Sequence, residues 1–158
     1  MANTQSMCTT FMGELLTSTH NFGVAPIRAA STADTFKAAL YLTTGTVNAN
    51  TSVYSATDEV SGSGYTAGGV AVTNGTVPAQ TNTSATAGTA YWTPSASITY
   101  TSVTLATAFD CVLIYNSTQS NKAVSVHTFG SQTITAGTFT LTMPANTTST
   151  ALLRLATT

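Results

Sequence analysis

The chain has 158 residues, which suits a single domain with a sizeable core, and only 6% of its residues are charged, far below the usual quarter. Thr and Ser make up about a third of the chain and supply its polarity. Abundant β-branched residues with little charge favour extended strands over disorder. The net charge is -1 and the four basic residues are scattered, which argues against nucleic acid as a partner because phosphate binding needs clustered Lys and Arg.

The first residues, MANTQSMCTTFMGELL, predict no secretory signal, because no basic start precedes an apolar run. No uninterrupted apolar segment approaches the length of a membrane-spanning helix. Cys8 and Cys111 lie in different contexts and do not suggest a disulfide framework. So little surface charge suits a protein that sits permanently in an assembly.

Residues 6–19 are predicted to form the one helix of the chain. Met7, Phe11 and Leu15 recur at three- and four-residue spacing, and Asn21-Phe22-Gly23 supplies a stop. The helix is short and rich in Thr, so propensity alone would not hold it. Its apolar stripe is therefore expected to dock on the protein's own sheet or on a neighbouring subunit.

Beyond Pro26 the pattern changes to strands separated by turn signals, and residues 76–89 read as an exposed low-complexity loop. The fold class predicted is all-β, an antiparallel β-sandwich or barrel-like domain with one short N-terminal helix. Residues 1–25 are expected to form an N-terminal arm and the helix, and residues 26–158 a single antiparallel β domain. Strands are predicted over residues 36–43, 53–55, 69–73, 90–93, 98–104, 108–115, 122–129, 139–143 and 151–155, of which 108–115 and 122–129 form the clearest hairpin.

The stretch DEVSGSGYTAGG, residues 58–69, is the first candidate site. Residues 62–67 fit the Ala-ended dinucleotide fingerprint, but a strand follows where the nucleotide fold requires a helix, so no cofactor is predicted. Asp58 and Glu59 could supply half of a calcium site. Adjacent residues point to opposite sides of an extended chain, so a solvated turn is the preferred interpretation and no metal is predicted.

The chain contains few residues of the types that act in catalysis. Cys111 lies in the most apolar strand, where an inert buried thiol is expected, and Cys8 lies in the predicted helix. His127 is interpreted as a half-buried strand residue, and no Gly-X-Ser-X-Gly elbow occurs. The chain has only two histidines, His20 and His127, and five carboxylates. Because so few residues could form a catalytic group, the sequence predicts no enzyme activity.

Four aromatic residues allow two interpretations. They could line a sugar-binding shelf, or they could belong to the core or to a subunit interface, which is the commoner use of such residues. These residues are Tyr91, Trp92, Tyr100 and Tyr115.

The order of several segments resembles a family of small structural proteins of tailed bacteriophages, over about residues 10–156. Asp110-Cys111-Val112 departs from the Arg-Gly-Ala that members of this family often carry, and Asp110 in a buried strand calls for a partner. The segments that carry the resemblance are residues 11–16 with 20–22, 35–41, 54–57 running into 59–69, 113–116 with 121–124, and 129–130 before 137–141.

The resemblance implies a virion component present in many copies, with no catalytic residues to carry over. Such a protein is expected on the capsid surface, made in the host cytoplasm, as a cement or decoration protein. It would form a trimer and cross-link the major capsid protein through apolar surface and strand edges. The residues expected at the interface are Phe11, Leu15, Leu16, Tyr91 and Trp92.

Two alternatives remain. One is a tail or fibre-base component, or a host-surface module that binds glycans through the aromatic shelf. The other is a small hydrolase or lectin-like domain unrelated to virions.

Overall fold

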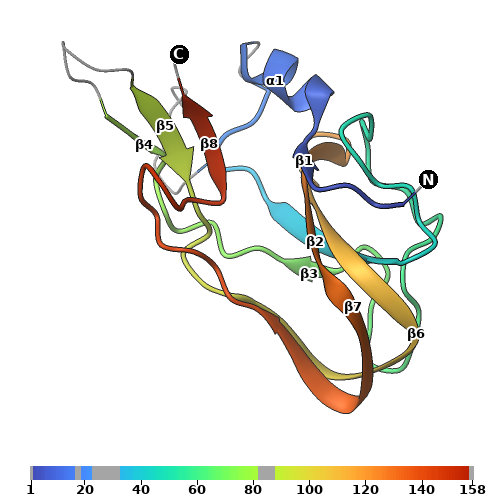
Figure 1. Cartoon of the computed structure of the whole chain (residues 1–158). Helices are drawn as coiled ribbons and strands as arrows, with labels where there is room; N and C mark the ends of the chain where they lie inside the picture. Colours follow the sequence, from blue (N-terminus) through green and yellow to red (C-terminus); the bar gives the residue numbers. More distant parts are fainter. Residues whose placement is uncertain (1, 17–18, 23–32, 82–87, 157–158) are drawn as a thin grey trace.

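A computed structural model describes residues 2–16, 19–22, 33–81 and 88–156, with the backbone alone for Gly13 and Leu16. The chain forms two antiparallel sheets and one short helix (Figure 1). The five-stranded sheet has the order β1-β7-β6-β2-β3, and the three-stranded sheet has the order β4-β5-β8. The predicted all-β class is thus confirmed as a sandwich-like arrangement, and the described strands do not close into a barrel. The expected domain boundary at residues 25 and 26 lies outside the described residues.

The centre of the fold is a long hairpin of β6 (Ile98–Asn116) and β7 (Lys122–Leu141). The two strands pair from Asn116 with Lys122 at the turn to Ile98 with Leu141 at the far end. The predicted hairpin is confirmed, but each of its strands joins what the sequence predicted as two separate strands.

The segments between the predicted strands, residues 105–107 in β6 and the Gly-containing residues 130–138 in β7, bend the ribbon instead of ending it. Several register shifts occur between Tyr100 and Cys111, and Ser102 and Ala136 have positive φ values of 54° and 47°. Extra residues in one strand of a pair bend it and increase its twist. Phe129 and Phe139, from opposite sides of the bend in β7, lie 5.2 Å apart between ring centroids.

Strand β2 (Phe36–Leu42) pairs with β6 and is almost wholly buried, as expected for an apolar run in mid-sheet. Its other edge carries the two-residue strand β3 (Val70–Ala71). The smaller sheet consists of β4 (Ala79–Gln80), β5 (Thr89–Trp92) and β8 (Leu153–Ala156). Strand β4 falls in the segment predicted as a loop, part of which, residues 82–87, lies outside the described residues.

The helix is shorter than predicted. Helix α1 runs from Thr9 to Leu16, whereas β1 (Ser6–Met7) pairs with β7 at Val126 and Ser125. Cys8 precedes the helix and donates its backbone N–H to Val124. The Thr-rich sequence has low helix propensity, and the edge of β7 offers backbone hydrogen bonds instead.

Aromatic side chains link the N-terminal segment to both sheets. Phe22 stacks on Phe36 of β2 at 4.5 Å and contacts Trp92 of β5 at 4.7 Å, and it meets Phe11 of α1 edge-on at 5.9 Å. Such ring pairs add to the gain from burial. The helix therefore docks on the protein's own core, on the side of the smaller sheet.

Candidate functional site

An apolar groove lies between α1 and the sheet β4-β5-β8, with a volume of about 240 Å³. In Figure 1 the helix and this sheet stand at the upper end of the molecule. No Asp, Glu, Lys or Arg lines the groove; its titratable lining residues are His20 and Tyr91. The lining residues are Met7, Phe11, Leu15, His20, Phe22, Pro78, Ala90, Tyr91, Trp92, Leu153 and Leu155.

The groove brings together four of the five residues predicted at an interface. Phe11 and Trp92 form its floor and are 2% and 3% exposed, whereas Leu15 and Tyr91 are half-buried. Leu16 lies in α1, and its side chain is outside the described residues. The first two residues therefore serve the core and cannot be the outermost contacts of this site.

Three apolar side chains that face solvent lie on or next to the elements that form the groove, and we call them its rim, although only Leu155 lines the groove itself. Met12 of α1 and Leu155 of β8 are 47% and 42% exposed, and Val77, which precedes lining residue Pro78, is 46% exposed. Leu155 was not predicted as a site residue, because the sequence of a strand near the end of the chain does not show which of its faces will be covered.

A polar network beneath the groove fixes the helix to the central hairpin. His20 Nε2 lies 2.7 Å from Glu14, and Lys122 also pairs with Glu14. Asn116 donates to His20 Nδ1 at 3.1 Å and to Asp34 at 2.7 Å. Since Nδ1 accepts, Nε2 carries the proton, and His20 is the neutral tautomer that donates to Glu14. Burial lowers the pKa of His20 against the opposing effect of Glu14.

The glycine-rich stretch is a structural clamp, and the prediction that Glu59 is a solvated turn residue is wrong. The Glu59 carboxylate accepts hydrogen bonds from Tyr54 at 2.6 Å, from Tyr65 at 2.7 Å and from the Gly68 backbone at 2.7 Å. Tyr65 in turn accepts the backbone N–H of Leu40 in β2. Of the two carboxylates only Asp58 remains exposed, together with Ser61, Ser63 and Thr66. The Glu59 carboxylate and the Tyr65 hydroxyl therefore attach the stretch to the sheet.

The four aromatic residues do not form an exposed shelf. Trp92, Tyr100 and Tyr115 are 3% or less exposed, and Tyr91 is half-buried. The hydroxyls of Tyr100 and Tyr115 donate to the backbone oxygens of Ala38 and Gly68, at 2.9 and 2.7 Å. These side chains are core residues, as the preferred interpretation held.

Both thiols are buried and held protonated. Burial, with a smaller contribution from Glu14, raises the pKa of Cys8 to about 11, and burial with the nearby Asp110 raises that of Cys111 to about 12. Asp110 has the partner that the sequence called for, because Asn3 donates to it at 2.7 Å. Among the residues described, no group of three His, Cys, Asp or Glu side chains is placed to hold a metal ion.

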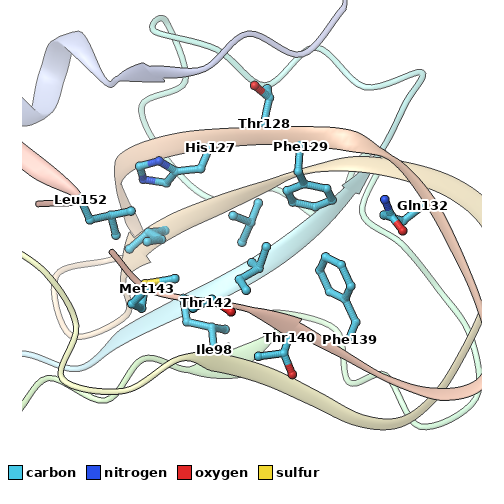
Figure 2. A pocket seen from close by; sticks show the side chains of 13 residues that line it. Ile98, His127, Thr128, Phe129, Gln132, Phe139, Thr140, Thr142, Met143 and Leu152 are labelled. Atoms are coloured by element: carbon cyan, nitrogen blue, oxygen red, sulfur yellow. The ribbon is translucent and has the colours of Figure 1, made fainter. Parts of the chain in front are cut away.

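A second hollow, the ribbon cleft, lies inside the bend of the β6–β7 ribbon and has a volume of about 290 Å³. Phe129 and Phe139 point into it from its two sides, and His127 and Leu152 lie at one end (Figure 2). Ile98, Val112 and Ile114 form part of its apolar lining.

His127 lies between this cleft and the neighbouring surface and is half-buried, as predicted. Its Nε2 lies 2.9 Å from the Ser125 hydroxyl, and burial lowers the pKa to about 4. A histidine with a lowered pKa in the folded state binds its proton more readily when the chain is unfolded. Its stabilising contribution is therefore complete above about pH 6.5 and is lost as the pH falls toward 4.

We therefore expect the free energy of unfolding to fall on acidification from pH 7 to pH 4.5. The slope from His127 is at most about 1.4 kcal/mol per pH unit, and His20 adds to it in the same direction. Urea denaturation at a series of pH values measures this slope. His127→Gln removes its share of the slope, and a stability that rises between pH 7 and 5 would contradict the assignment.

In the described part of the chain, no helix combines the length and the apolar character needed to cross a bilayer. The fold and the groove thus define an all-β domain with an apolar recess at one end. Comparison with known proteins adds no relative: no family model, no curated protein and no solved structure matches the chain.

Proposed function

We propose that the protein is a structural component of a tailed-bacteriophage virion, a capsid cement or decoration protein that binds the major capsid protein on the head exterior. The proposal starts from the resemblance of its segments to small phage structural proteins. The role is non-catalytic, and the site of action is the capsid surface after synthesis in the host cytoplasm.

The observation that carries the proposal is the exposed apolar rim of the groove. Three of the four large apolar side chains exposed among the described residues, Met12, Val77 and Leu155, belong to α1 or lie in or beside the smaller sheet. Apolar surface grouped around an uncharged recess is typical of a protein-binding site. A coat segment that covers the rim would bury apolar area without desolvating a charge.

The geometry of the groove also explains how the protein would cross-link coat subunits. The core holds α1 through Phe11 and Phe22, and the polar network holds it through Glu14 and Lys122. A rigid site loses little conformational entropy when it binds. A coat subunit docked at the groove would therefore be held rigidly to any neighbouring coat subunit that contacts the rest of the domain.

Quantification of purified particles tests the proposal. We expect the wild-type protein at tens to hundreds of copies per particle, and we expect Leu155→Glu to lower its incorporation at least tenfold by placing a charge on the rim. Val53→Glu is the matched control, because Val53 is 48% exposed but does not line the groove. Densitometry against the major coat protein gives the ratio.

About six to twelve copies per particle would overturn the cement proposal and support the tail or fibre-base alternative. Equal incorporation of Leu155→Glu and Val53→Glu would show that the groove is not the contact. The glycan-binding version of the alternative loses its structural basis, because Trp92 and Tyr100 are buried.

A further inference from the structure

The outer edge of β7 is open over most of its length. On one side β7 pairs with β6 throughout. On the other side it pairs with β1 at Ser125 and Val126, and backbone contacts with Cys8 and with residues 52–53 cover residues 122–124. From residue 129 to residue 141 no described strand covers this edge. The bend of the ribbon lies at the opposite end of the molecule from α1 (Figure 1).

This edge lacks the charged residues and the proline that usually prevent an exposed strand edge from pairing with another chain. Natural proteins place charged residues or proline on exposed edges, or use bulges, to prevent pairing with another chain. No Asp, Glu, Lys or Arg occurs between Lys122 and Arg154, and β7 contains no proline. Its protection consists of the register shifts between residues 128 and 139, with a positive φ at Ala136, and the pairing with β6 is regular again from Phe139 to Leu141.

The sequence of this stretch is complementary to itself. Residues 138–142 read Thr-Phe-Thr-Leu-Thr, which has the same pattern of polar and apolar positions in both directions. Thr138, Thr140 and Thr142 are exposed, whereas Phe139 and Leu141 are half-buried. Residues 139–142 all lie along the ribbon cleft, the two threonines at its exposed side. An antiparallel pair centred on Thr140 would set Thr against Thr on one face and Phe139 against Leu141 on the other.

We propose that a second copy of this chain pairs along this edge, antiparallel and about a two-fold axis near Thr140. Cross-strand Phe–Leu pairs, together with the backbone hydrogen bonds of the new ladder, stabilise such an arrangement. Two uncharged edges also meet without like-charge contact. The same patch serves both partners, as a two-fold interface requires.

The length of the edge selects a second β7 over other strands. The other strands at sheet edges, β1, β3, β4 and β8, are two to four residues long and offer few ladder hydrogen bonds. The trimer implied by the family resemblance would have to join β7 to one of these short edges. The geometry therefore points to a dimer, and it does so whether or not the virion proposal is correct.

Charge placed at the centre of the edge tests the pairing. Thr140 is exposed, so Thr140→Lys and Thr140→Glu should leave the monomer folded. Each variant alone puts like charges opposite each other across the two-fold axis, and we expect the dimer dissociation constant to rise at least tenfold. An equimolar mixture of the two variants restores the dimer, because Lys then faces Glu.

Sedimentation velocity from about 1 to 100 µM measures the oligomer, and thermal unfolding checks the fold of each variant. Thr107→Lys on β6 is the control, since Thr107 is exposed but not on this edge, and it should dimerise like the wild type. A wild-type protein that is monomeric at 100 µM overturns the proposal. So does a trimer, and so does a dimer that both Thr140 variants retain.

Discussion

Gly69→Ala is expected to destabilise the protein by about 4 kcal/mol or more, and to lower its melting temperature by roughly 10 °C or more. A Cβ at this position would lie 1.7 Å from the backbone oxygen of Ala38 in β2, which cannot move without breaking the sheet. Gly69 also has a φ of +70°, a conformation that alanine adopts only with strain. Calorimetry or urea denaturation of the purified variant measures the effect.

Gly130→Ala is the matched control for this substitution. Gly130 lies in β7, and a Cβ added there would meet nothing within 4 Å. Its φ is not among the positive values, so alanine fits without strain. We expect a change within about 0.5 kcal/mol. Equal effects at the two positions would show that the contact with Ala38 is not what requires glycine.

The second large effect is expected at Glu59. Glu59→Ala removes the acceptor of two tyrosine hydroxyls and of the Gly68 backbone N–H, and should cost about 3 kcal/mol. Glu59→Gln keeps the carbonyl oxygen for Tyr65 and Gly68. Its amide can donate to Tyr54, whose hydroxyl is free to rotate.

The glutamine variant should therefore lose about 1 kcal/mol or less. Urea denaturation of both variants, followed by circular dichroism, compares the two losses. If Glu59→Gln were as unstable as Glu59→Ala, the negative charge and not the hydrogen-bond pattern would hold the stretch in place.

The sequence predicted the elements that depend on local pattern. Strand β2 and the turn between Asn116 and Lys122 follow from apolar runs and turn residues, and the structure confirms both.

The features that the sequence did not predict depend on tertiary context. Thr and Gly between two apolar runs can end a strand or bend it, and only the partner strand decides which occurs in β6 and β7. The helix pattern over residues 6–19 lost its first part to the edge of β7, which offers backbone partners that propensity cannot take into account.

The residues expected at an interface share one place in the fold, because Phe11, Leu15, Tyr91 and Trp92 all line the groove. That they contact a partner stays a prediction. Which of them face outward depends on how far the helix lies from the smaller sheet. No local pattern encodes that separation, so Met12 and Leu155 emerge only from the structure.

The two ladders of β6, with β7 and with β2, differ in the loop-closure entropy that their formation costs. Five residues separate β6 from β7, whereas the first pair of the β2 ladder, Phe36 with Asn116, closes a loop of 80 residues (116 − 36). Loop-closure entropy makes the longer connection costlier by about 2.5 kcal/mol. The buried side chains of β2 offset this cost, so the middle of the sheet relies on side-chain burial where the hairpin relies on its short turn.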